Sequence, residues 1–185
     1  MAAVAPPASF MDKQTLSKAR VLVTGDAMLD RYWFGDAERI SPEAPVPVVR
    51  ISRTEERLGG AANVAVNIAS VGGRSSLLCV VGNDEPGRTL ERFAREQGIT
   101  PHFQFDESLD TTVKLRVVAR QQQMLRCDFE SHPAEEALNK HLDKFRALLA
   151  EHDALILSDY GKGGLSHIVS MIAIIRSEPN RRMTS

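Results

Sequence analysis

A pair of glycines followed by a run of small apolar residues constrains this chain more than any other stretch. Gly59 and Gly60 precede a segment in which alanine, valine and isoleucine fall on almost every side of a helix, and Gly72 and Gly73 then suit a helix C-terminus. A helix that is apolar almost all round is buried in a fold. The sequence therefore predicts a buried helix over residues 59–71.

The start of this helix is a candidate binding site. Its first backbone N–H groups have no partner within the helix, and the two glycines let a ligand approach the backbone. Asn63 lies in the expected first turn, where its amide can both donate and accept hydrogen bonds. Two interpretations stay open: a turn in which Asn63 caps the helix, and a site for the hydroxyl or anionic groups of a ligand.

Composition and charge exclude several classes of function. The 185 residues are 43% hydrophobic and 25% charged, with a formal net charge of −1, which is typical of one globular domain without a nucleic-acid or membrane partner. The first residues lack the basic and apolar regions of a signal peptide, and no run approaches the roughly 18 apolar residues of a membrane span. We expect a cytoplasmic chain.

The cysteines and histidines argue against a disulfide and a zinc site. Cys79 and Cys127 each lie in an apolar, strand-like run, which favours buried thiols in a reducing compartment. The histidines are scattered without the spacing of metal ligands, so we predict no metal site. They are His102, His132, His141, His152 and His167.

Strand and helix patterns alternate along the chain, which favours an α/β fold with a doubly wound, mainly parallel sheet and helices on both faces. One domain is expected over residues 19–176, after a loose leader at 1–18 and before an irregular tail at 177–185. We predict strands over residues 20–26, 77–82, 99–105 and 154–159, helices over 84–98 and 134–150, and a hairpin of 111–120 and 124–130 around 121–123.

Residues 31–57 do not resemble a central strand. The segment combines Tyr32, Trp33 and Phe34 with three prolines, and proline is tolerated only at sheet edges and turns. We predict an edge ribbon that projects from the body. Such an apolar ribbon either covers a pocket as a lid or pairs with a second subunit, and the two roles are compatible.

Polar residues follow the first and last predicted strands, where open α/β sheets bind their ligands. Asp30 is either a solvated or capping carboxylate or a group that accepts two hydrogen bonds from vicinal sugar hydroxyls. Lys162 lies among three glycines and can reach an anionic ligand. The spacing of a P-loop and the glycine fingerprint of a dinucleotide site are both missing, so a nicotinamide enzyme is disfavoured.

Four motifs together resemble the ribokinase or PfkB family of carbohydrate kinases, over residues 20–176. The segment from Asp30 to Trp33 and the proline-rich residues 40–48 are similar to the heptose 7-phosphate kinases of that family. The motifs are Gly25-Asp26-x-x-x-Asp30, Leu58-Gly59-Gly60-Ala61-Ala62-Asn63-Val64-Ala65, Val81-Gly82-Asn83-Asp84-x-x-Gly87 and Ser158-Asp159-Tyr160-x-Lys162-Gly163.

The resemblance implies transfer of the γ-phosphoryl group of ATP, with Mg²⁺, to the anomeric hydroxyl of D-glycero-D-manno-heptose 7-phosphate, on the route to ADP-heptose and lipopolysaccharide core. It also implies that the ribbon acts as lid and as clasp of a homodimer. By position, Asp30, Gly59, Gly60 and Asn63 would hold the sugar. The basic residues Lys114, Arg116, Arg120 and Arg126 are either a solvated hairpin face or contacts for the 7-phosphate, and Lys162 is a further candidate contact.

The 185 residues lack the family's later motifs, namely the Asp-Pro-Lys loop, the Asn-x-x-Glu associated with Mg²⁺ and the Gly-Ala-Gly-Asp that supplies the catalytic base. We therefore expect no catalytic or metal-binding residue here and no C-terminal half of the fold. Residues 177–185 resemble an out-of-frame or artificial end. The alternatives are a non-catalytic remnant that binds sugar phosphate or dimerises, and a kinase of fructose, ribose or a nucleoside.

Overall fold

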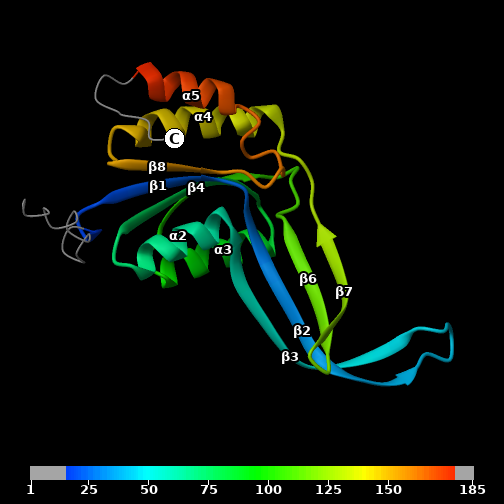
Figure 1. Cartoon of the computed structure of the whole chain (residues 1–185). Coiled ribbons are helices and arrows are strands. Elements are labelled where there is room, and N and C mark those ends of the chain that lie inside the picture. The colour runs from blue at the N-terminus through cyan, green and yellow to red at the C-terminus, as the bar shows by residue number, and fades with distance from the viewer. Residues whose placement is uncertain (1–15, 178–185) are drawn as a thin grey trace, which may run out of the picture.

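The computed structural model describes residues 16–177, which form two four-stranded sheets and four helices (Figure 1). The first sheet forms the body with the helices, and the second extends away from it. The elements are β1 (Arg20–Gly25), β2 (Ala27–Ile40), β3 (Pro47–Gly60), α2 (Ala61–Ser70), β4 (Arg74–Gly82), α3 (Glu85–Glu96), β5 (Thr100–Asp106), β6 (Val113–Ala119), β7 (Gln122–Phe129), α4 (Glu135–Leu149), β8 (Ala154–Ser158) and α5 (Ile168–Ser177).

The body sheet has the order β5-β4-β1-β8, and all its strands are parallel. Helices α2 and α3 cover one face and α4 and α5 the other (Figure 1). Neighbouring residues of β1 point to opposite faces: Val23 packs in the α2 and α3 core and Leu22 packs against Phe145 of α4, all fully buried. The predicted doubly wound α/β fold is confirmed.

The second sheet, called here the lid sheet, has the order β3-β2-β6-β7. Strand β2 follows β1 after the single residue Asp26. It pairs with β3 in antiparallel orientation and with β6 in parallel orientation. The predicted ribbon of residues 31–57 is therefore too short, and its inner part is not an edge, because β6 pairs with β2 from Leu29 to Gly35. Local sequence carries no signal for a pairing partner so far along the chain.

Beyond Gly35, β2 and β3 project from the body as a two-stranded arm (Figure 1). The prolines lie at a turn and at the start of a strand, as the sequence predicts. Pro42 and Pro45 lie in the connection between the strands, and Pro47 is the first residue of β3, so none of them interrupts the inner part of the sheet.

The turn between β6 and β7 differs from its predicted place at residues 121–123. It is formed by Arg120 and Gln121, which have φ of 50° and 66°. Positive φ at both central residues is typical of a type I′ two-residue turn, which usually contains asparagine or glycine. This turn has neither residue, so its position could not be read from the sequence.

Helix α2 is less buried than predicted. Ala61, Ala62 and Ala65 are fully buried against the body sheet, whereas Asn63 is exposed and Val71, just after the helix, is 51% exposed. The helix covers one face of a sheet, so only one of its sides meets a partner within the described chain. Its predicted end is confirmed: Gly72 has φ of 97° and donates to Ala69, and Gly73 donates to Ile68.

The other helices match their predictions closely. Helix α3 starts after Asp84 and contains Pro86 in its first turn, and α4 falls within the predicted residues 134–150. Strand β4 begins three residues before its predicted start at Leu77. Ser177 belongs to α5 and not to the predicted tail. The rest of that tail, and residues 1–15 of the predicted leader, lie outside the described residues.

Both thiols are free. Cys79 is buried, and burial raises its pKa well above the usual range, so it stays protonated. Cys127 on β7 is only partly buried, in contrast to the prediction, because β7 is an edge strand.

Between residues 16 and 177, no helix is long and apolar enough to span a membrane, and no three His, Cys, Asp or Glu side chains are placed to hold a metal ion.

A buried histidine makes the stability of the fold depend on pH. His141 of α4 is 2% exposed, and its Nε2 is 3.0 Å from the Thr24 hydroxyl of β1. Burial, together with the nearby His167, lowers the pKa of His141 to about 4. The ring is therefore neutral in the folded chain at neutral pH, whereas in the unfolded chain it titrates near 6.5.

We expect acid to destabilise the protein through His141. Between pH 6.5 and 4 the unfolded chain binds this proton and the folded chain does not, so the free energy of unfolding should fall by about 3 kcal/mol across that range. Urea unfolding at several pH values measures the slope. His141→Leu should remove most of it, whereas the same change at exposed His132 should preserve it. An unchanged slope in His141→Leu would contradict this assignment.

Candidate functional site

Asp26, at the junction of β1 and β2, is fully engaged by backbone. It is 5% exposed, and its carboxylate accepts hydrogen bonds from the N–H groups of Tyr160, Lys162 and Gly164 at 2.8, 3.0 and 2.8 Å. A Cβ on Gly164 would lie 2.6 Å from the same carboxylate. Asp26 therefore fixes the loop after β8 to the point where the body meets the lid sheet.

Asp84 has a similar role at the end of β4. Its carboxylate accepts from the N–H of Gly87 at 2.8 Å and from the N–H and hydroxyl of Thr111 at 2.9 and 2.7 Å. The Thr111 hydroxyl in turn accepts from the N–H of Gly82 at 2.8 Å. The residue thus joins the end of β4, the start of α3 and the approach to β6. Neither Asp26 nor Asp84 is free to bind a ligand.

Asp30 lies on the lid sheet, on the side called here the front face. In the strand register, Asp30 of β2 is flanked by Arg57 of β3 on one side and by Lys114 of β6 on the other. Its Oδ1 accepts from Arg116 Nη1 at 2.6 Å, and its Oδ2 would lie 2.4 Å from a Cβ at Gly59. The first glycine of the pair is therefore explained by the carboxylate that rests against it.

Gly60 is required by its backbone. Its φ of 58° and ψ of −134° are strained for other residues, and a Cβ there would lie 2.3 Å from the carbonyl oxygen of Asp26. That carbonyl accepts from the N–H of Ala61 at 2.9 Å. The sequence predicts that the first N–H groups of this helix are available to a ligand. The first of them, that of Ala61, is already hydrogen-bonded to Asp26.

Basic and aromatic residues surround Asp30 on the front face. The guanidinium groups of Arg57 and Arg116 each lie 5.1 Å from the centre of the Tyr32 ring. Arg116 lies directly opposite Arg126 of β7. The structure therefore brings Asp30, Gly59, Lys114, Arg116 and Arg126 into one region, although they come from four strands.

The remaining candidates lie elsewhere. Asn63 is exposed and lines a recess beside β3, together with Arg57 and Phe93. Lys162 forms an ion pair with Glu130 at the end of the lid sheet. Arg120 is in the hairpin turn. Within residues 16–177, no hydrogen bond or ion pair joins any of these three side chains to Asp30, so their assignment to one site stays a prediction.

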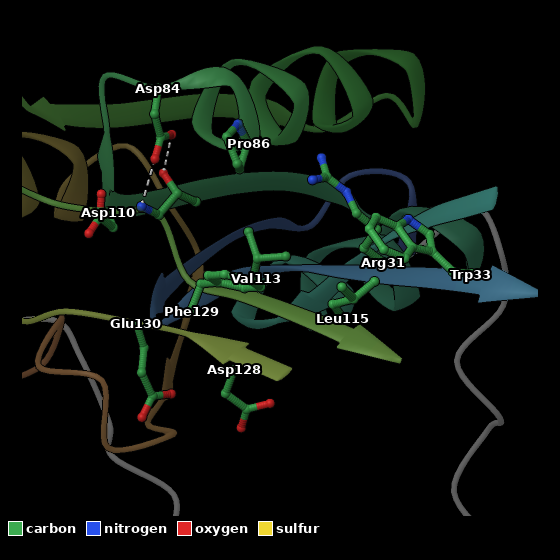
Figure 2. Close-up of a pocket in the computed structure, with 11 residues that line it drawn as sticks. Arg31, Trp33, Asp84, Pro86, Asp110, Val113, Leu115, Asp128, Phe129 and Glu130 are labelled. Carbon is green, nitrogen blue, oxygen red and sulfur yellow. Dashed lines mark hydrogen bonds between the residues drawn. The ribbon is translucent and has the colours of Figure 1, made fainter. Parts of the chain in front are cut away.

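The opposite side of the lid sheet, the back face, has a hollow of roughly 620 Å³ (Figure 2). Arg31 and Trp33 of β2, Val113 and Leu115 of β6 and the first turn of α3 line it. Figure 2 shows Asp84 and Pro86 on its α3 side and the strand residues below them. Asp30 does not line this hollow, but Asp128, the ion-pair partner of Arg126, does, so the hollow and the front-face site meet at the edge strand β7.

The sequence of this chain is similar to those of known proteins of one family. The pfkB family carbohydrate kinases match residues 18–173. The chain belongs to this family. Among curated pfkB relatives, a D-beta-D-heptose 7-phosphate kinase of Bordetella bronchiseptica is 54% identical over 160 residues, which cover 86% of this chain and 51% of the relative. A bifunctional protein HldE of Methylococcus capsulatus is 52% identical over 160 residues, 86% of this chain and 34% of its own length.

Solved structures of pfkB kinases have the same fold. Phosphofructokinase-2 from Escherichia coli, in complex with substrates and products, aligns with a TM-score of 0.66 at 20% identity, over 85% of this chain and 50% of that protein. A ribokinase from Cryptococcus neoformans aligns with a TM-score of 0.58 at 17% identity, over 86% and 46%. The chain thus spans about half of these kinases, and a third to a half of the two curated relatives.

The sequence interpretation missed the partners of the pfkB motif residues. Asp26 and Asp30 both belong to the first motif, but their roles differ. Asp26 fixes the loop after β8, whereas Asp30 forms an ion pair with Arg116 on the lid sheet. Arg57, Tyr32 and Glu55, which complete the front face, were not singled out as site residues. Their alternation with Asp30 along β2 and β3 was the signal, because residues two apart share one face of a strand.

Proposed function

We propose that this chain is the substrate-binding part of an ATP-dependent kinase that phosphorylates the anomeric hydroxyl of heptose 7-phosphate. The observation that carries the proposal is the front face, where a carboxylate seated on Gly59 lies beside Lys114 and Arg116. A carboxylate suits sugar hydroxyls and a cluster of cations suits a phosphate. The identity to heptose 7-phosphate kinases supports the choice of sugar.

The roles follow from the positions. Asp30, with Gly59 and Gly60 behind it and Asn63 at the recess, holds the sugar, and Lys114, Arg116 and Arg126 hold the 7-phosphate. Lys162 can contribute only after leaving Glu130. Holding the sugar in one orientation is the main contribution of such a surface, because phosphoryl transfer depends on position and on neutralised charge.

The described residues do not fit a magnesium site. Kinases of this family use ATP and Mg²⁺, but no acidic cluster in residues 16–177 is placed to hold a metal ion. Asp26 and Asp84 have their oxygens engaged by backbone N–H groups. No step of the reaction is therefore assigned to a metal held by this part of the chain.

A kinase assay tests the proposal. The chain of 185 residues and a longer chain, extended through the family's Gly-Ala-Gly-Asp motif, are incubated with ATP, Mg²⁺ and heptose 7-phosphate, with fructose 6-phosphate and ribose as competing sugars. We expect turnover by the longer chain only, with phosphate added at the anomeric carbon. Preference for another sugar would reassign the substrate. Binding of heptose 7-phosphate without turnover by either chain would indicate a non-catalytic sugar-phosphate protein.

We also propose that the chain forms a homodimer through the lid sheet, in which the predicted ribbon of residues 31–57 contributes Trp33 and the edge strand β7 contributes two further apolar side chains. Tyr32 and Phe34 stack on the front face beneath arginines. Trp33, 36% exposed, instead shares the back face with Leu125 and Phe129, both 55% exposed. A second copy is a suitable cover for this apolar surface.

Light scattering at tens of micromolar should give the mass of a dimer for the folded chain. Leu125→Lys should shift it to the mass of a monomer, because a buried lysine has no partner in an apolar interface. Val169→Lys on α5 introduces the same charge at a position that is 78% exposed, and it should leave the dimer intact. A monomeric unaltered chain would refute this interface.

A further inference from the structure

Two groups that the proposed site needs for different parts of its ligand are bonded to each other. Asp30 Oδ1 accepts from Arg116 Nη1 at 2.6 Å, and both side chains are only 20% exposed. Charge-assisted hydrogen bonds of this kind are the stronger ones in proteins. Sugar hydroxyls must therefore compete with Arg116 for the carboxylate.

The cations around Arg116 are arranged for an anion. Arg116 lies directly opposite Arg126 across β6 and β7, and Lys114 precedes Arg116 by two residues on the same face. Like charges directly opposite each other destabilise a sheet. Arg126 pairs with Asp128 at 2.9 Å, whereas Lys114 has no ion pair within residues 16–177. The carboxylates of Asp30 and Asp128 relieve the repulsion among these cations only in part, and a bound phosphate would offset the rest.

Of the two side chains, Arg116 is the one with room to move. Asp30 rests against the backbone at Gly59, where even a Cβ would lie within 2.4 Å of its Oδ2. Arg116 has a long side chain with other contacts available: its Nη1 lies 3.4 Å from the Lys114 carbonyl, and its guanidinium lies 5.1 Å from the Tyr32 ring. A small rotation of Arg116 frees Asp30 without any change in the backbone.

We propose that the ion pair of Asp30 and Arg116 selects phosphorylated sugars: a phosphate draws Arg116 away, and the freed carboxylate then accepts the sugar hydroxyls. The inference rests on the proposed function and adds a coupling between the two ends of the ligand. A sugar without phosphate has to displace Arg116 unaided and binds weakly. By linkage, phosphate tightens sugar binding and sugar tightens phosphate binding by the same factor.

The test is a titration of the 185-residue chain followed by NMR, through the amide signals of Gly59 and Gly60. Heptose is titrated with and without saturating inorganic phosphate, and heptose 7-phosphate is titrated alone. We expect phosphate to tighten heptose binding about fivefold, in line with a partly exposed ion pair. This arm uses the unaltered chain, so it does not depend on the folding of a variant.

Two variants sharpen the result. Arg116→Gln should weaken heptose 7-phosphate binding tenfold or more, strengthen heptose binding about fivefold and abolish the effect of inorganic phosphate. Arg126→Gln is the matched control, because it removes a cation from the same cluster without touching Asp30. It should weaken heptose 7-phosphate binding and leave heptose binding unchanged.

The outcomes separate this inference from the proposed function. If heptose 7-phosphate binds but heptose and phosphate bind independently, the selection mechanism is wrong and the proposed function stands. The same holds if Arg116→Gln weakens both sugars equally. If a folded chain binds neither heptose nor heptose 7-phosphate, the proposed function and this inference both fail.

Discussion

Asp26→Ala should lower the free energy of unfolding by about 3–5 kcal/mol, because three backbone N–H groups lose a charged acceptor at a site that is 5% exposed. A loss of that size is a large fraction of the stability of a typical domain. Asp26→Asn keeps the shape but turns an N–H₂ group toward backbone donors, so we expect about half of the loss. Urea unfolding, monitored by circular dichroism, measures the free energy of unfolding of both Asp26 variants.

Asp159→Ala provides the matched control in the same loop. Asp159 is exposed, and its carboxylate accepts one N–H, that of Gly161, at 2.8 Å. Replacement by alanine should cost less than about 1 kcal/mol. Equal losses in the Asp26 and Asp159 variants would show that the loop does not depend on the buried carboxylate.

Asp30→Ala should reduce kcat/KM for heptose 7-phosphate by a factor of about 100 or more in the longer chain, which corresponds to roughly 3 kcal/mol. The sugar hydroxyls would lose their acceptor in a closed site, and Arg116 would lose its partner. The kcat/KM of Asp30→Asn should lie between those of the unaltered protein and Asp30→Ala, because an amide oxygen still accepts a hydrogen bond but carries no charge. Initial rates over a range of sugar concentrations give both kinetic constants.

Asp36→Ala is the control for that experiment. Asp36 lies on the same strand, is exposed, and is beyond the region where β6 pairs with β2. Its removal should leave both constants within about twofold, as for most surface changes. Unchanged kinetics in Asp30→Ala would remove this residue from the site.

Local signals in the sequence predicted much of the body. Asp84 and Pro86 mark the start of α3, and Gly72 and Gly73 mark the end of α2, because caps depend on a few neighbouring residues. The alternation of residues along β6 puts Val113 and Leu115, both buried, on one face of the strand and Lys114 and Arg116 on the other. Such patterns act over one or two turns or one strand.

The lid sheet could not be predicted in the same way. Arg116 meets Asp30 across 86 residues of sequence, and only the parallel register of β2 and β6 brings them together. The engagement of Asp26 likewise depends on a loop more than 130 residues later. The sequence predicted Asp30, Gly59, Arg116 and Lys114 as separate candidates, but their meeting on one face depends on tertiary pairing.

The parallel pairing of β2 with β6 also affects the order in which the chain acquires structure. The hairpin of β2 and β3 is local and can form early in synthesis, whereas β6 is made only after α2, β4, α3 and β5. Pairings of high contact order form slowly because a long loop must close first. During that interval the inner edge of β2 is unpaired, and an unpaired edge readily recruits other strands. Chaperone demand during translation should therefore be greatest before residue 113 leaves the ribosome.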